Sequence, residues 1–254
     1  MKNMTKILII FLLLICAGCS PVSDDKYYAI DHFYFYEEGD EFKTAFNKAT
    51  IDVYNWYSGI EGEDGVYILH SEHYNDELLD SWRDNRVFGN IPDKEFWYFA
   101  VSENYLYDRG YELNKDDKQL IRAGVRLYLL PDKLSKEEGD QMKEFLKEDA
   151  LYGLIAEPLI KTSFETDQEI EFKTYHSDIS LETEEEGEIR NPIIFVCSSE
   201  NMRFFESESL IATGKKDSYI KLTRDVYEKY AGDNLPEKLK ERSFAFLPLN
   251  KIKN

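Results

Sequence analysis

The hydrophobic residues in the first half of the chain follow helical and extended periods in turn. Between Asp40 and Gly59 they recur every three or four positions, which predicts an amphipathic helix that Gly59 ends. Short runs of aromatic and β-branched residues predict strands at residues 33–36, 66–69 and 96–101. The first half therefore alternates between strands and helices.

Two further helices carry end signals in the sequence. Asn75 stands at the N-cap of a short helix whose apolar residues are Leu78, Leu79 and Trp82. Ser135 and Glu138 form a capping box, in which each side chain accepts a hydrogen bond from the other residue's backbone N–H. One face of the helix that they open carries Met142, Phe145 and Leu146, and Gly153 is expected to end it.

The second half holds four more predicted strands, and Pro131 is expected to end the first of them. They lie at residues 124–130, 170–174, 192–197 and 218–222. An acidic loop is expected at residues 182–188, a helix at about 224–231, and a last helix near Pro236.

The order of these elements indicates an α+β fold, in which mixed sheets are covered by helices on one face. The charged stretch at residues 112–120 has no period and suits either a linker or a surface loop. As a linker it divides the chain into an N-terminal α+β subdomain, 27–115, and a C-terminal α+β subdomain, 116–254. As a loop it leaves one large domain.

The first residues have the layout of an export signal. Lys2 and Lys6 precede nine apolar residues at 7–15, and small residues then lead to Cys19. Small residues before a cysteine resemble the bacterial lipobox, which predicts a cleaved signal peptide at residues 1–18 and lipidation of Cys19. Residues 19–26 would form the lipidated tether. This layout predicts a protein anchored on the extracytoplasmic face of the cell membrane. The alternative is an uncut signal anchor.

Composition narrows the classes of partner. With 43% hydrophobic residues the chain can bury a core, and no apolar run after residue 20 is long enough to cross a bilayer. The formal charge is −19, and loss of Lys2 and Lys6 with the signal makes it more negative. Such a surface repels nucleic acid and favours cationic partners. Acidity that serves only solubility is the alternative.

The cysteines argue against thiol chemistry. After the signal only Cys19 and Cys197 remain, and lipidation of the first excludes an intramolecular disulfide. Cys197 ends a continuous apolar run, so we expect a small buried hydrophobe rather than a nucleophile.

No motif for catalysis, metal binding or a cofactor stands out. His70 and His73 are three apart with Asp76 nearby, but the HExxH pattern is absent, and a solvated loop is expected there. The Glu184–Glu186 run is likewise expected to be a solvated loop. We therefore expect no enzyme, no metal and no cofactor. Paired carboxylates acting as an acid and a base remain the enzymatic alternative, because 50 acidic residues supply many pairs.

The aromatic residues allow two interpretations. They form either an interface for a peptide or carbohydrate or the packed core of a sheet. The residues concerned are Tyr27, Tyr28, Phe33, Tyr34, Phe35, Tyr36, Tyr105, Tyr107 and Tyr111.

A family resemblance is carried by five segments of the region 90–223: Arg126–Pro131, Ser135–Glu138, Asn191–Val196, Glu200–Met202 and Ser218–Leu222. In this order they resemble the extracytoplasmic region of the bacteriocin-associated integral membrane proteins. That family is assigned to immunity or export in Gram-positive bacteria and is similar in layout to ABC-transporter permeases. It carries several membrane spans, whereas this chain has none after the signal, and it supplies no functional residue for these positions.

The resemblance implies an outer module that contacts a peptide or a membrane partner. Our hypothesis is a surface-anchored, non-catalytic lipoprotein that binds a cationic peptide or an ABC-transporter-like membrane protein. The alternatives are a lipid-anchored hydrolase that uses paired carboxylates and a purely structural envelope lipoprotein.

Overall fold

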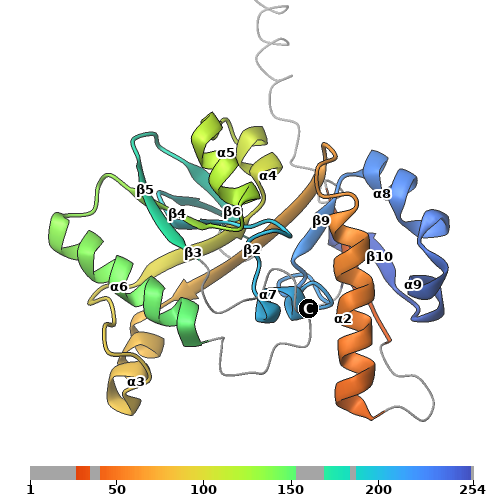
Figure 1. The fold of residues 1–254 in the computed structure, drawn as a ribbon, viewed down its shortest axis with the longest axis horizontal. Coiled ribbons are helices and arrows are strands. Elements are labelled where there is room, and N and C mark those ends of the chain that lie inside the picture. Colours follow the sequence, from red (N-terminus) through yellow and green to blue (C-terminus); the bar gives the residue numbers. More distant parts are fainter. Residues whose placement is uncertain (1–26, 35–40, 153–168, 184–186, 253–254) are drawn as a thin grey trace, which may run out of the picture.

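The computed structural model describes residues 27–34, 41–152, 169–183 and 187–252, and its centre is a mixed sheet of eight strands (Figure 1). The predicted α+β class is confirmed. The strands lie in the order β10 (Ala245–Pro248), β1 (Tyr28–His32), β9 (Ile220–Leu222), β2 (Val66–Tyr74), β3 (Phe96–Val101), β8 (Ile193–Val196), β4 (Arg126–Pro131) and β5 (Ile170–Tyr175).

Strands from the first and the second half of the chain are intermixed in this sheet. β2 and β3 are antiparallel neighbours, and β9 and β8 flank them from the second half. The ranges 27–115 and 116–254 therefore share one sheet. Neither a linker nor a surface loop describes the whole stretch 112–120, because α5 (Lys115–Arg122) begins there, and its N-cap Asn114 accepts a hydrogen bond from the Asp117 N–H at 2.9 Å.

Helices cover both faces of the sheet, so the expectation of a single covered face is wrong. β8 shows the reason, because Ile193 and Phe195 join the larger core cluster, and Ile194 and Val196 join the smaller one. A strand that is apolar on both sides needs cover on both sides.

The larger cluster packs beneath five helices, and the smaller one beneath two helices and a hairpin. The five are α2 (Phe42–Ser58), α3 (Asp76–Asn85), α6 (Lys136–Tyr152), α8 (Arg224–Tyr230) and α9 (Glu237–Glu241). On the other face lie α4 (Glu103–Asp108), α5 and the pair β6 (Ser180–Thr183) and β7 (Gly187–Arg190). In Figure 1, α4 and α5 lie above the sheet, and α3 and α6 lie below it.

The predicted helix ends are confirmed where the structure describes them. Gly59 is the C-cap of α2, and the Asn75 side chain accepts from the Leu78 N–H at 2.9 Å. The capping box of α6 is present, because Ser135 N donates to Glu138 at 2.9 Å and Glu138 N donates to Ser135 Oγ at 3.2 Å. The apolar face of α6 is buried, as predicted.

Several predicted strands need new boundaries. A strand lies at Tyr28–His32, where it pairs with both β9 and β10, and of the strand expected at 33–36 the described residues Phe33 and Tyr34 lie just beyond its end. β2 continues to Tyr74 because it pairs with β3 along residues 69–74. β4 begins at Arg126 rather than at residue 124, and it ends at Pro131, which is its last residue. The expected acidic loop at 182–188 begins and ends in the strands of the β6–β7 hairpin.

Some predictions lie outside the described residues. These are the signal peptide at 1–18, the tether at 19–26 with Cys19, the helix stop at Gly153 and the Glu184–Glu186 run. Within the part of the chain that the structure describes, no helix is both long and apolar enough to cross a membrane.

Candidate functional site

The candidate site lies where the parallel strands β3 and β8 end. The two are neighbours, and the Cys197 N–H extends their pairing by donating to Val101 O at 2.8 Å. Beyond β3 the chain enters α4 on the smaller cluster's face. Beyond β8 it turns toward Met202 in the larger cluster. The segments that follow two neighbouring parallel strands go to opposite faces of the sheet, and this opens a crevice at the carboxyl ends of the strands. Such a crevice is the usual ligand position in sheets of this kind.

A pocket of about 190 Å3 occupies this crevice. Its buried lining includes the side chains of Tyr57, Ile121 and Cys197, which are between 0% and 4% exposed. Its more exposed lining carries three carboxylates and one guanidinium. They belong to Glu61, Glu103, Glu200 and Arg122. The pocket thus combines an apolar floor with a net acidic opening.

The turn after β8 is held by one buried side chain. Asn201 donates to Val196 O at 2.8 Å and to Val125 O at 3.1 Å, and its Oδ1 accepts from the Ser198 N–H at 2.9 Å. The neighbouring Gly124 has a φ of 82°, and a Cβ there would lie 3.2 Å from the Glu200 carbonyl oxygen. The turn is therefore rigidly placed against the start of β4.

Glu61 reaches the site from the turn that follows α2. Its carboxylate accepts hydrogen bonds from the Ser199 N–H at 2.8 Å and from the Ser199 hydroxyl. Asn104 of α4 fixes the same turn by donating to Glu61 O at 3.1 Å. Burial raises the pKa of Glu61 above its usual value despite these hydrogen bonds. The nearby Glu200 carboxylate raises it further.

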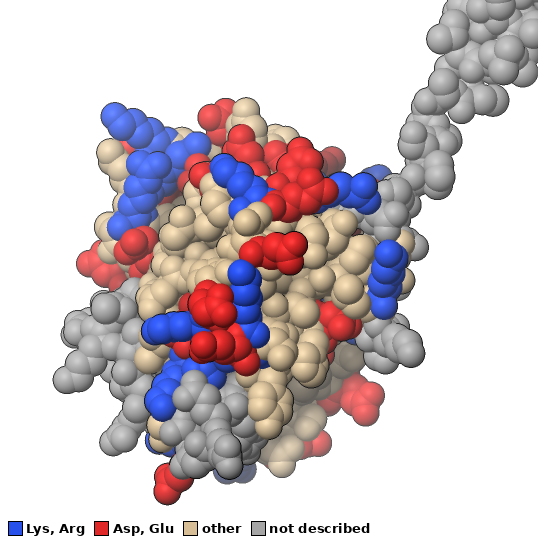
Figure 2. Space-filling view, turned by 90° about the vertical axis from the view of Figure 1, so that its right-hand side faces the viewer, with Lys and Arg blue, Asp and Glu red and all other residues tan. Residues whose placement is uncertain are grey.

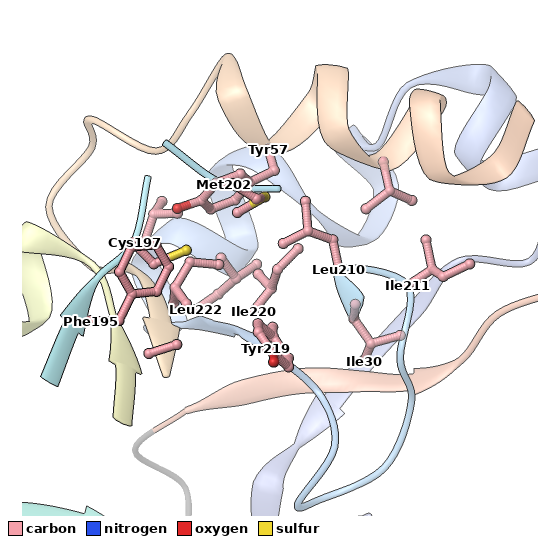
Figure 3. Packing of buried hydrophobic residues seen from close by; sticks show 14 of the residues in the cluster. Ile30, Tyr57, Phe195, Cys197, Met202, Leu210, Ile211, Tyr219, Ile220 and Leu222 are labelled. Carbon is pink, nitrogen blue, oxygen red and sulfur yellow. The ribbon is translucent and has the colours of Figure 1, made fainter. Parts of the chain in front are cut away.

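Tyr57 supplies the least satisfied polar atom of the pocket. Its side chain is fully buried, and its hydroxyl has no hydrogen-bond partner of normal geometry in the described part of the chain. Burial raises its pKa well above the usual value, and the Glu61 carboxylate adds to that rise. Figure 3 shows its ring above the larger cluster, with the hydroxyl on the side of Cys197.

Cys197 is confirmed as a buried residue, at 1% exposure. Burial raises the pKa of its thiol well above the usual value, with Glu206 as the next cause. A thiol that resists ionisation is a poor nucleophile. The structure therefore gives Cys197 no role in covalent chemistry at this pocket.

A second polar cluster, the Arg126 cluster, lies close to the pocket but deeper in the core. Arg126 is 2% exposed and donates to Glu206 at 2.7 Å, to the Tyr128 hydroxyl at 3.1 Å and to Asn201 O at 3.3 Å. Its guanidinium also lies 4.0 Å from the centre of the Phe195 ring.

The two histidines of the metal alternative lie on β2 rather than in the expected loop. Residues three apart on a strand point to opposite faces, so the imidazoles are separated. His70 stacks on Tyr219 at 4.3 Å, and burial lowers its pKa to about 4. His73 stacks on Trp97 at 4.5 Å. No group of three possible metal ligands occurs among the described residues.

The candidate aromatic residues do not share one surface. Tyr27 and Tyr105 are buried in the smaller cluster, and Tyr28 packs against the larger one. Tyr34 and Tyr107 are exposed, at 56% and 61%. Phe35 and Tyr36 lie outside the described residues. Most of the described aromatic residues therefore belong to the core.

The sequence interpretation missed the pocket. Tyr57 has the helical spacing of a core residue, and Glu61 and Glu200 sit in ordinary polar turns. Only the pairing of β3 with β8 brings them together. On the surface that carries α8 and α9, acidic and basic side chains are interspersed, so this face shows no patch of a single charge (Figure 2).

Comparison of the chain with protein-family models, with curated proteins and with solved structures finds no match. The resemblance of region 90–223 to the bacteriocin-associated proteins therefore stays a prediction.

Proposed function

We propose that this protein is a lipid-anchored, extracytoplasmic binding protein without catalytic activity. Cys19 holds it at the cell membrane, and it binds a cationic peptide or a cationic part of an ABC-transporter-like membrane protein. The context is a bacteriocin-associated immunity or export system. The observation that carries the binding role is the acidic pocket at the ends of β3 and β8, with Glu61, Glu103 and Glu200 in its lining.

Electrostatics supports a cationic partner at two ranges. The net charge of −19 raises the local concentration of cations around the whole protein and speeds their encounter. The pocket then offers carboxylates beside a low-dielectric floor, where an ion pair is stronger than in open water. Long-range attraction determines the rate of encounter, and the pocket determines which group stays bound.

The predicted anchor limits where the partner lies. Seven residues lie between Cys19 and Tyr27, where the described chain begins, and the eight fully extended Cα–Cα steps span at most about 28 Å. The folded body therefore begins near the bilayer surface. A membrane protein or a membrane-directed peptide is concentrated at the same surface, which favours its encounter with the anchored protein.

A binding experiment tests this role with the full chain purified in detergent. A lysine- and arginine-rich peptide should bind, and an acidic peptide of equal length should not. Association should slow as salt rises from low to physiological concentration, while dissociation changes less. No binding to cationic peptides, together with unchanged peptide sensitivity of a deletion strain, would leave the structural-lipoprotein alternative.

The anchor has its own test. Cys19→Ala should abolish incorporation of a radiolabelled fatty acid and release the protein from the membrane fraction. Ser20→Ala is the matched control and should leave both unchanged. Equal lipid labelling of Cys19→Ala and the wild type would contradict the lipoprotein assignment.

The hydrolase alternative has one observation in its favour. Glu61 has a raised pKa and shares the pocket with Glu200, so one carboxyl could stay protonated while the other is ionised. Screening against glycan and peptide substrates separates the two functions. Turnover that disappears in Glu61→Gln and persists in Glu63→Gln would favour the enzyme.

A further inference from the structure

We propose that the pocket at the ends of β3 and β8 binds the ammonium group of a single lysine side chain, with the Glu61 carboxylate and the Tyr57 hydroxyl oxygen as acceptors. This inference rests on the proposed function, because it names the chemical group of the cationic partner that the pocket recognises. It adds a specific site to what net charge alone would give.

The Tyr57 hydroxyl is the observation that points to a ligand. Its residue is 0% exposed and it lines the pocket. Among the described residues its hydroxyl makes no hydrogen bond of normal geometry, and its interaction with the neighbouring Glu61 carboxylate, which helps to raise the Tyr57 pKa, leaves the hydroxyl oxygen free to accept. Leaving a buried hydroxyl unsatisfied costs about 1–3 kcal/mol. A donor placed in the pocket would remove that cost, and an ammonium group supplies three donors.

The occupied oxygens of Glu61 favour an ammonium over a guanidinium. Both oxygens accept from Ser199, one from its N–H and one from its hydroxyl. A guanidinium forms its strongest pair as a fork against two free carboxylate oxygens, which Glu61 does not offer. An ammonium is a compact point charge and needs only one remaining lone pair on each acceptor.

The other carboxylates define the charge at the opening. Glu103 is neutralised by Lys118 at 2.9 Å, whereas Glu200 is exposed on the turn after β8. The pocket therefore holds a second carboxylate close enough to Glu61 that its charge raises the Glu61 pKa, and a bound cation would be attracted to both. A divalent metal lacks the necessary ligands, because no group of three ligating side chains exists in the described residues.

The volume of the pocket sets the size of the guest. At about 190 Å3 it is smaller than the roughly 300–1,000 Å3 of pockets that enclose whole drug-sized ligands. It suits one long side chain whose methylene groups pack on Ile121 and Val196. The rest of the partner would lie outside on the surface.

The test compares three peptides on the full chain in detergent, with affinity measured by calorimetry. One peptide carries lysines, the second carries the same lysines Nε-acetylated, and the third carries arginines. The lysine peptide should bind at least about tenfold more tightly than the acetylated one, because acetylation removes the charge and two of the donors. The arginine peptide should bind more weakly than the lysine peptide.

Three variants locate the binding group. Tyr57→Phe removes the hydroxyl and keeps the ring, and Glu61→Gln removes the charge and keeps the shape. Each should weaken the lysine peptide by about tenfold, because each deletes one hydrogen bond to a charged group. Glu63→Gln is the matched control, because Glu63 is exposed, pairs with Lys229 at 2.9 Å and does not line the pocket. It should bind like the wild type.

The outcomes separate this inference from the proposed function. Lysine-peptide binding that both pocket variants leave unchanged would overturn the pocket assignment and keep the cationic partner. Equal affinity for the lysine and arginine peptides would overturn the preference for ammonium. Absence of binding by all three peptides would overturn both. Because Tyr57→Phe removes only an unsatisfied hydroxyl, its thermal unfolding should show that the variant remains folded.

Discussion

Two polar clusters lie close to Cys197, and they differ in how completely their hydrogen bonds are made. Arg126 donates to Glu206, to Tyr128 and to a backbone carbonyl, all inside the core. Glu61 is also hydrogen-bonded, but among the described residues the Tyr57 hydroxyl beside it makes no hydrogen bond of normal geometry. Cys197 is close enough to both clusters that Glu206, Arg126 and Glu61 all affect its pKa.

The difference separates a structural cluster from a candidate site. A charge pair with all its donors and acceptors satisfied has nothing left to offer a ligand, so it fixes the core. A pocket with an unsatisfied hydroxyl and a half-buried carboxylate retains that capacity. Burial alone therefore does not identify function here, because the more deeply buried cluster is the structural one.

The Cys197 thiol, which is close to both clusters, should show the largest effect. Cys197 is expected to react with a bulky maleimide at least about a thousandfold more slowly in the native protein than in denaturant, because reaction requires unfolding. Mass spectrometry of the peptide that contains Cys197 measures this rate. Similar rates in both states would show that the pocket admits large molecules to its floor.

Breaking the Arg126 cluster should give the next largest effect. Glu206→Gln leaves the Arg126 charge buried without its partner and should lower the free energy of unfolding by about 3–5 kcal/mol. Chemical denaturation measures the loss. Replacing both residues with apolar ones, as in Arg126→Met with Glu206→Leu, should recover most of it. A double variant no more stable than the single one would show that the pair itself stabilises the fold.

A third test uses the acid of α6 that lies within electrostatic range of the Arg126 cluster. Burial raises the pKa of Asp149 to about 6 from an unfolded value near 3.8, so the folded state binds its proton more tightly. Ionisation of Asp149 therefore lowers the free energy of unfolding. This loss is absent below about pH 4, grows between about pH 4 and 6, and is complete above that range. Asp149→Asn should therefore stabilise the protein at pH 7 by up to about 3 kcal/mol and change little at pH 4. Equal differences at both pH values would contradict the raised pKa.

The smallest effect is expected from the pocket. Tyr57→Phe removes a hydroxyl that makes no normal hydrogen bond, so thermal unfolding should show unchanged stability or a gain of up to about 1 kcal/mol. Tyr128→Phe is the contrast, because its hydroxyl accepts from Arg126, and it should cost about 1–3 kcal/mol. A larger loss from Tyr57→Phe than from Tyr128→Phe would reverse the comparison between the two clusters.

Local signals predicted much of the fold, but not the site. Helix α2, the Asn75 cap, the Ser135–Glu138 capping box and the buried strand β8 follow from residue spacing alone. β10 and β1 are short, and their pairing with each other in the folded protein defines them more than the hydrophobic pattern of their sequences does. The pocket depends on Tyr57, Ser102 and Cys197 meeting across three elements, and no sequence period records such a meeting.

The pairing of β1 with β10 joins the two ends of the described chain, since Tyr28 lies opposite Pro248. Contacts at this separation are slow to form, because a long loop must close before they contribute. The β10-facing edge of β1 would stay open to other strands until β10 has been synthesised. One of the first strands of the described chain therefore completes its pairing only after a strand more than two hundred residues later has formed, and this edge of the sheet is most exposed to misassembly before β10 arrives.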